Sequence, residues 1–212
     1  MTVHGLALAL AYTGAALGVV MVVPQILRTL AHPKLGGVSP VAWSLTALAC
    51  SMWLTYGIRT MTVPQIPGNV LLVSGAVAVV LLVPSPTSRR RRAATLGSVA
   101  VVLVTVALLV PAQVVGYLAV SIGFVSAWPQ LYDSVSTWRA GARSGVSVVS
   151  WSIKSASQLC WLSYALLVAD VPVALSATVA LGTAVTLVAL ESLGILAERG
   201  RSSYLQTGTV QV

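Results

Sequence analysis

The sequence predicts an all-α membrane protein with seven transmembrane helices, in which two parallel three-helix repeats are joined by a linker helix. Three observations predict this fold: the composition, an internal duplication and the number of apolar segments. Hydrophobic residues make up 57% of the 212-residue chain and charged residues only 8%, whereas a soluble domain carries about 25% charged residues. Mean hydropathy is +0.93. These values indicate a chain whose solvent is the lipid bilayer.

The duplication is read from matches that recur in the same order. The dipeptide Pro-Gln occurs at residues 24–25 and again at 129–130, an offset of 105 residues. Three additional residues in a loop of the second copy then change the offset, and the later matches are 108 residues apart. They are GVSPVAWS (37–44) with GVSVVSWS (145–152), WLTYG (53–57) with WLSYA (161–165), and VP (63–64) with VP (171–172). A duplicated membrane unit usually places a solute path between its two copies.

The apolar segments set the topology, since a spanning helix needs roughly 20 apolar residues. We expect spans near 4–27, 40–58, 63–83, 95–111, 113–132, 147–168 and 171–192. Three crossings would invert a directly joined second copy, and the fourth span restores its orientation. The predicted units are a first repeat (1–84), a basic loop with the linker helix (85–112), a second repeat (113–196) and a polar, disordered C-terminal tail (197–212).

The net charge of +8 is distributed as a topology signal, not as a nucleic-acid patch. Most Lys and Arg residues fall in short loops on one side, and Arg59 is the exception. Basic loops face the cytoplasm, so we expect a plasma-membrane protein with its N-terminus outside and its C-terminus cytoplasmic. Cys50 and Cys160 lie in apolar runs and indicate neither a disulfide nor a metal site. No cofactor is expected, and no catalytic set of residues predicts an enzyme.

A pocket is predicted from helix spacing in the first repeat. Trp53, near the end of the second span, and Asn69, near the start of the third, both lie roughly 8–9 Å below the outer boundary. The same spacing places Trp161 beside Ala177 in the second repeat. Flat aromatic faces and an amide with donors and acceptors suit a sugar ring. The alternatives are interfacial anchoring of the Trp rings and an interhelical hydrogen bond from Asn69.

Lys154 is unusual because it lies inside the sixth predicted span. It shares one helix face with Gln158 and Trp161, at i, i+4 and i+7, where the first repeat has Thr46, Cys50 and Trp53. An ionisable side chain within a span is costly and usually faces a cavity. Lys154 could therefore neutralise a carboxylate or phosphate of a solute, with its amine beside Gln158. The alternative is that its stem reaches the cytoplasmic interface.

With its duplicated Pro-Gln motif and 3+1+3 helices, the chain resembles the PQ-loop superfamily. The Trp-x-x-Tyr-Gly segment at 53–57 is more specifically similar to the SWEET sugar transporters and their half-sized bacterial relatives. The resemblance implies a sugar pocket lined by the Trp and Asn positions. Ala177 departs from that pattern, because it occupies the Asn position of the second repeat.

The resemblance also implies moving parts. It implies a cytoplasmic hinge and an outer gate, and the positions that match them are Pro24, Gln25, Pro40, Pro129 and Gln130 for the hinge, and Tyr56 and Tyr164 for the gate. The fourth hinge proline is replaced by Val148. Arg59 and Asp170 lie just beyond the gate, either paired across it or as unpaired loop charges.

Three function classes follow. The first is a facilitative transporter of a sugar or similar small polar solute by alternating access. The others are a PQ-loop transporter of amino acids or organic anions, as in cystinosin-like proteins, and a non-transporting receptor like the KDEL receptor. Passive transport is expected because the carboxylates lie near span ends. The expected partners are a small-molecule solute and the lipid bilayer, and homo-oligomer formation is left open.

Overall fold

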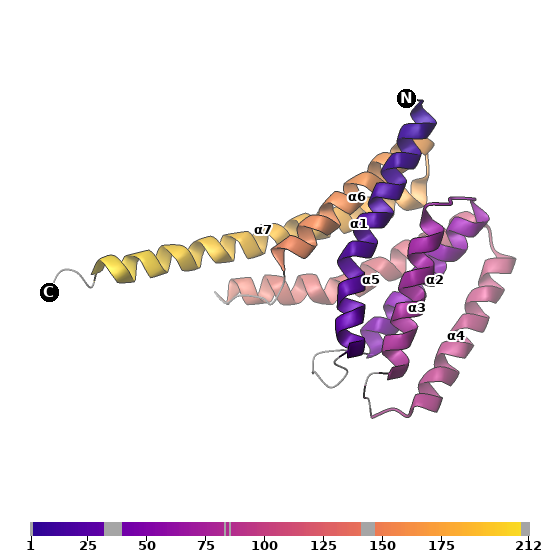
Figure 1. Ribbon diagram of the computed structural model, residues 1–212, viewed down its shortest axis with the longest axis horizontal. Helices are drawn as coiled ribbons and strands as arrows, with labels where there is room; N and C mark the ends of the chain where they lie inside the picture. The colour runs from indigo at the N-terminus through magenta and orange to yellow at the C-terminus, as the bar shows by residue number, and fades with distance from the viewer. Residues whose placement is uncertain (1, 32–39, 83, 85, 141–146, 209–212) are drawn as a thin grey trace.

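The computed structural model is all-helical in the residues that it describes. These are residues 2–31, 40–82, 84, 86–140 and 147–208, with side chains described except at 24–25, 28–29, 40–42, 129–130, 133 and 195–208. Seven helices occur in these ranges (Figure 1): α1 (Val3–Ala31), α2 (Pro40–Arg59), α3 (Gln65–Leu82), α4 (Arg89–Leu109), α5 (Ala112–Arg139), α6 (Val148–Val168) and α7 (Val171–Gly208).

Helix length and composition support an integral membrane protein. Four segments are long and apolar enough to cross a bilayer: Val3–Val23, Gln65–Leu82, Arg89–Leu109 and Val171–Gly194. Ala112–Trp128 is a shorter apolar segment of α5. The helices outside this set are α2 and α6, which carry the two Trp-x-x-Tyr segments together with several hydroxyl and amide side chains. Polar residues of a membrane helix usually face the protein interior, so α2 and α6 are the helices from which a polar path would be built.

Each triplet has the same order of neighbours. In the first, α3 packs closely against both α1 and α2, whereas the described backbones of α1 and α2 have no Cα atoms within 8 Å of each other. In the second, α7 packs closely against both α5 and α6, whose described backbones likewise have no Cα atoms within 8 Å of each other. The triplets meet through α1 with α6 and α2 with α5. The six helices therefore form a closed ring of neighbours, α1–α3–α2–α5–α7–α6.

The linker helix α4 lies outside this ring, against α2, α3 and α5. None of its residues is buried, which suits a helix surrounded largely by lipid. Arg92 in its first turn donates a hydrogen bond to the Val80 carbonyl near the end of α3. Arg59 of α2 donates to carbonyls at the other end of α4. Arginines thus fasten both ends of α4 to the first triplet.

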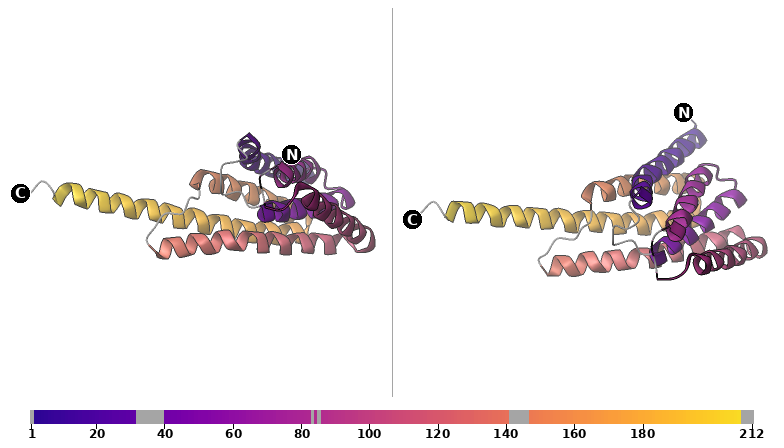
Figure 2. Two further views of the ribbon diagram at one scale, coloured as in Figure 1. Left: turned by 90° about the horizontal axis from the view of Figure 1, so that it is seen from below. Right: turned by 60° about the horizontal axis from the view of Figure 1, so that its bottom comes forward.

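The core shared by the two triplets lies at the end of the molecule where the α2–α3 and α6–α7 turns lie. Its members come from α1, α2, α5, α6 and α7: Ala7, Ala11, Met52, Tyr56, Val115, Ala119, Tyr164, Ala165 and Val173. Four of the nine are alanines, and small side chains let membrane helices approach closely. From this end α1–α4 run toward the bottom of Figure 1, whereas α5 and α7 run to the left, and Figure 2 shows the same divergence from two other directions.

Two predicted boundaries are wrong. The linker helix begins at Arg89 and not near residue 95, because Ser88 caps it by accepting a hydrogen bond from the Arg91 backbone N–H at 3.3 Å. The basic run is therefore a first helical turn. The predicted disordered tail is also wrong up to Gly208, since α7 continues to that residue. No proline follows Pro172 in the sequence, so nothing interrupts the helical hydrogen bonds where the sequence turns polar.

Candidate functional site

Two aromatic pairs occupy repeat-related positions near the shared core. Trp53 and Tyr56 lie with ring centroids 5.7 Å apart and an interplanar angle of 90°. Trp161 and Tyr164 repeat this arrangement at 5.8 Å and 87°. The tyrosines are 3% and 8% exposed, while both tryptophans are half-buried and pack against the shared core. An i, i+3 spacing places each pair on one helix face, and the two copies thereby present the same edge-to-face unit.

The tyrosine of the first repeat connects the two triplets. The Tyr56 hydroxyl donates to Asp170 Oδ1 at 2.7 Å. The same carboxylate oxygen accepts a hydrogen bond from the Val173 backbone N–H at 3.2 Å, in the first turn of α7. Gly116 of α5 lies close by, because a β-carbon there would be 2.7 Å from Pro172 Cβ and 3.0 Å from Tyr56 Cε2. This end of the molecule is therefore held together by a hydrogen bond to a charged group within tight packing.

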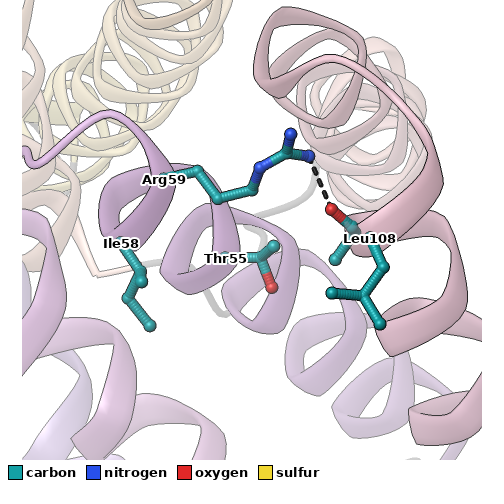
Figure 3. A pocket seen from close by; sticks show the side chains of 5 residues that line it. Thr55, Ile58, Arg59 and Leu108 are labelled. Atoms are coloured by element: carbon teal, nitrogen blue, oxygen red, sulfur yellow. Dashed lines mark hydrogen bonds between the residues drawn. The ribbon is translucent and has the colours of Figure 1, made fainter.

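The alternative in which Arg59 pairs with Asp170 is wrong for this conformation. The Arg59 guanidinium donates instead to the Ala107 and Val110 carbonyls, at 2.6 and 2.5 Å. Figure 3 shows this side chain reaching from α2 toward α4. The reason is geometric: the last carbonyls of a helix have no partner within the helix, and the end of α4 lies within reach of the guanidinium. Both charged groups are hydrogen-bonded to neutral groups, Arg59 to carbonyls of α4 and Asp170 to the Tyr56 hydroxyl.

A pocket of about 320 Å³ lies at this contact between α2 and α4, lined by Thr55, Ile58, Arg59, Ala107 and Leu108. Figure 3 shows Thr55, Ile58 and Leu108 around the arginine. None of the predicted solute-binding residues lines it. The pocket lies outside the ring of six helices, where the linker helix α4 packs against α2.

Asn69 forms a hydrogen bond within its own helix. Its Nδ2 donates to the Gln65 carbonyl at 2.8 Å, one turn earlier in α3. The interhelical hydrogen bond considered for this side chain is therefore not its contact in this structure. Asn69 is half-buried, and in the part of the chain that the structure describes its side-chain oxygen accepts no hydrogen bond. That oxygen can accept a hydrogen bond from a solute. Ala177, the equivalent residue, is 1% exposed and has no polar group to offer.

The face of α6 that carries Trp161 lies against α1. The Ser157 hydroxyl donates to the Gly14 carbonyl at 2.8 Å. A β-carbon at Gly14 would lie 3.0 Å from Trp161 Cδ1 and 3.1 Å from its Nε1, so the absence of a side chain at Gly14 permits the approach. The packing is looser at Gly18, one turn further along α1, where a β-carbon would lie 3.8 Å from Ser157 Oγ. Gln158 is half-buried. In the equivalent position of α2, Cys50 is a half-buried free thiol.

Lys154 lies one turn before Ser157 on α6. Its Nζ is 4.5 Å from the centroid of the Trp151 ring. Among the described residues this cation–π contact is its recorded interaction, with no hydrogen bond to Gln158 and no ion pair. A lysine at the centre of a membrane helix costs about 2.5–3.5 kcal/mol, which is an upper value for Lys154 at the seventh position of α6, and a cation–π contact returns about 0.5–2 kcal/mol. Among the described residues, the three N–H donors of the amine have no hydrogen-bond acceptor.

The hinge residues lie partly outside the described side chains. Pro24 and Gln25 lie within α1, Pro129 and Gln130 within α5. The predicted spans 4–27 and 113–132 end two residues after Pro-Gln, and these two ends are wrong, because α1 continues to Ala31 and α5 to Arg139. Pro40 is the first residue of α2, a position that proline favours because its missing N–H has no helical partner there. The hinge role of these residues stays a prediction.

Sequence reasoning missed four residues of this region: Gly14, Gly116, Trp151 and Ser157. The signal for Gly14 was present, because Gly14 and Gly18 form the Gly-x-x-x-Gly spacing typical of close helix contacts in membranes. Trp151 was also readable as the i−3 neighbour of Lys154. For Gly116 and Ser157 the sequence contains no such pattern.

Comparison with known proteins identifies the fold. No protein-family model matches the chain, and no curated protein matches it. A solved structure of a eukaryotic SWEET transporter, determined at 3.7 Å resolution, superposes with a TM-score of 0.73 at 15% sequence identity. The match covers 89% of this chain and 98% of that one. The chain therefore has a SWEET-like membrane-transporter fold, as its resemblance predicted.

Proposed function

We propose that the protein is a facilitative transporter that moves a sugar or similar small polar solute by alternating access. The solute path runs between the two triplets, along the axis of the six-helix ring. The two triplets are parallel repeats, related by rotation about the membrane normal. The outer end carries the N-terminus and the inner end the C-terminus, at the plasma membrane.

The observation that carries the proposal is the unequal contact between the triplets. They share a core and the Tyr56–Asp170 hydrogen bond at one end, and their helices diverge toward the other (Figure 1). Two like units joined at one end can exchange this arrangement for one joined at the opposite end by rocking against each other. In this proposal the present conformation is the outward-closed state, and the prolines within α1 and α5 provide the bend.

The side chains along the proposed path favour a polar, ring-shaped solute. Trp53 and Trp161 offer half-buried aromatic faces in both triplets. The Asn69 oxygen and the Gln158 amide offer hydrogen bonds to hydroxyl groups, and Cys50 lies on the same face of α2 as Trp53. Because the second repeat has Ala177 where the first has Asn69, the two halves recognise the solute unequally. The solute therefore has chemically different ends.

The test is uptake into proteoliposomes containing the purified protein. Labelled neutral sugars, amino acids and organic acids are offered singly, with protein-free liposomes as the control. We expect saturable uptake of a small polar solute that needs neither a pH gradient nor a membrane potential. Saturable binding without uptake of any solute would indicate a receptor and contradict the proposal. Uptake that requires an imposed proton gradient would contradict its facilitative character.

A further inference from the structure

The strongest unassigned feature is the Lys154 amine, and it bears on the class of solute. Lys154 is half-buried in α6, and its position is the seventh of that helix. At about 1.5 Å per residue it lies roughly 9 Å from the first residue of α6. Its amine rests on the Trp151 ring at 4.5 Å and has no acidic partner among the described residues. A charged group without an acceptor contributes little to the stability of the fold, because its burial costs free energy and it holds no neighbouring residue in place.

The stripe of α6 to which Lys154 belongs faces the boundary between the triplets. Ser157 and Trp161, three and seven residues later, both contact Gly14 of α1. Residues spaced by three and four lie on one helix face, so Lys154 continues this face toward the diverging end. The recorded contacts of α1 with this stripe loosen from Gly14 to Gly18. Lys154 therefore lies where the two triplets separate.

The charge is unmatched in the other repeat. Thr46 occupies the equivalent position of α2, and Trp43 the position equivalent to Trp151. Trp43 packs against the cluster of Ile26 and Val79 in the first triplet, whereas the Trp151 ring contacts the Lys154 ammonium group. One half of the path thus offers a cation and the other a neutral hydroxyl. A solute with a single negative group at one end complements this asymmetry.

We propose that the transported solute is a small hydroxylated carboxylate, of the sugar-acid type, and that the Lys154 amine leaves Trp151 to bind its carboxylate. The inference rests on the transport function proposed above and narrows its solute class. The aromatic faces and the Asn69 oxygen bind the hydroxylated part. The amine provides charge-assisted hydrogen bonds, which are roughly twice as strong as neutral ones. The Trp151 ring keeps the cation near the path when no solute is bound.

The experiment compares glucuronate with glucose, which differ by a carboxylate in place of a hydroxymethyl group. Uptake of both is measured in proteoliposomes for the native chain, Lys154→Met and Lys154→Arg. The matched control is Arg90→Met, which removes the same charge from an exposed position on α4. Thermal unfolding of each variant in detergent establishes that it is folded. Lys154→Met should fold, since it removes a charge from the membrane.

We expect the native chain to prefer glucuronate. Lys154→Met should lower glucuronate uptake by roughly one to two orders of magnitude, as for the loss of a hydrogen bond to a charged group, and leave glucose uptake within about twofold. Lys154→Arg should retain a measurable part of it, and Arg90→Met should resemble the native chain. Unchanged glucuronate uptake in folded Lys154→Met overturns the inference. Native uptake of glucose without glucuronate also overturns it and leaves the transport function standing, whereas no uptake of any solute removes both.

Discussion

Replacing Tyr56 by phenylalanine removes one of the hydrogen bonds between the two triplets and little else. The hydroxyl donates to Asp170 Oδ1 at 2.7 Å, and the ring is 3% exposed within the shared core. Phenylalanine keeps the ring, its packing against the core and its contact with Trp53. The perturbation is therefore confined to one hydroxyl group that spans α2 and the start of α7.

The magnitude follows from the partners of the carboxylate. A hydrogen bond to a charged group contributes about 1.5–3 kcal/mol. Asp170 Oδ1 keeps its hydrogen bond from the Val173 N–H in the variant, so the carboxylate is not left without a donor, and the lower value applies. A change of about 1.4 kcal/mol is tenfold in an equilibrium constant. The ratio of outward-open to outward-closed molecules should therefore rise about tenfold.

The assay is a distance measurement between spin labels at Val63 and Val171, in a chain whose two native cysteines are replaced. These repeat-related residues lie between α2 and α3 and at the start of α7, and they are 50% and 53% exposed. In Tyr56→Phe the longer distances should gain population. The control is Tyr164→Phe, which removes the equivalent hydroxyl where no hydrogen bond is recorded among the described residues. An unchanged distribution in Tyr56→Phe, or an equal shift in Tyr164→Phe, would refute the reasoning.

Three further outcomes are expected. Gly116→Ala should lower the unfolding temperature in detergent, since overpacking typically costs about 1–3 kcal/mol and the new β-carbon would lie 2.7 Å from Pro172 Cβ. The control is Gly123→Ala, whose β-carbon would have no atom within 4 Å. An equal change of unfolding temperature in the two variants would contradict the tight packing at Gly116. Arg59→Leu should speed amide hydrogen exchange at the end of α4, because it removes two hydrogen bonds to carbonyls there. An unchanged exchange rate would show that Arg59 does not bind these carbonyls in the membrane. Asn69→Ala should weaken solute binding about tenfold in titrations and have little effect on the unfolding temperature, since the recorded hydrogen bond of Asn69 lies within α3. If the variant unfolds and its affinity for the solute is unchanged, Asn69 has a structural role.

Much of the fold could be predicted because it depends on properties that a sequence carries directly. Apolar length and the offset repeats are readable without coordinates, and the structure has helices where each of the seven spans was expected. The boundaries were less predictable. The start of α4 depends on one capping serine, and the end of α7 depends on the absence of a helix-breaking residue beyond Pro172. Neither effect contributes to hydropathy.

The site was less predictable because partners are chosen by packing between distant helices. Tyr56 and Asp170 were both expected at the outer end, yet the sequence could not show that a tyrosine and not Arg59 would reach the carboxylate. The position of α4 decides this, because its terminal carbonyls bind the guanidinium. The contact of Lys154 with Trp151 is different, since a spacing of three residues in a helix makes it readable in advance.

The most direct test of alternating access between the two triplets is counterflow. Proteoliposomes are loaded with a high concentration of unlabelled solute and diluted into a trace of the same solute carrying a label. A carrier whose binding site faces one side at a time should accumulate the label transiently above its equilibrium level, because returning binding sites are occupied by unlabelled solute. We expect this overshoot, and we expect Tyr56→Phe to alter its rate. Label that only rises to equilibrium would indicate an open pore and contradict the account.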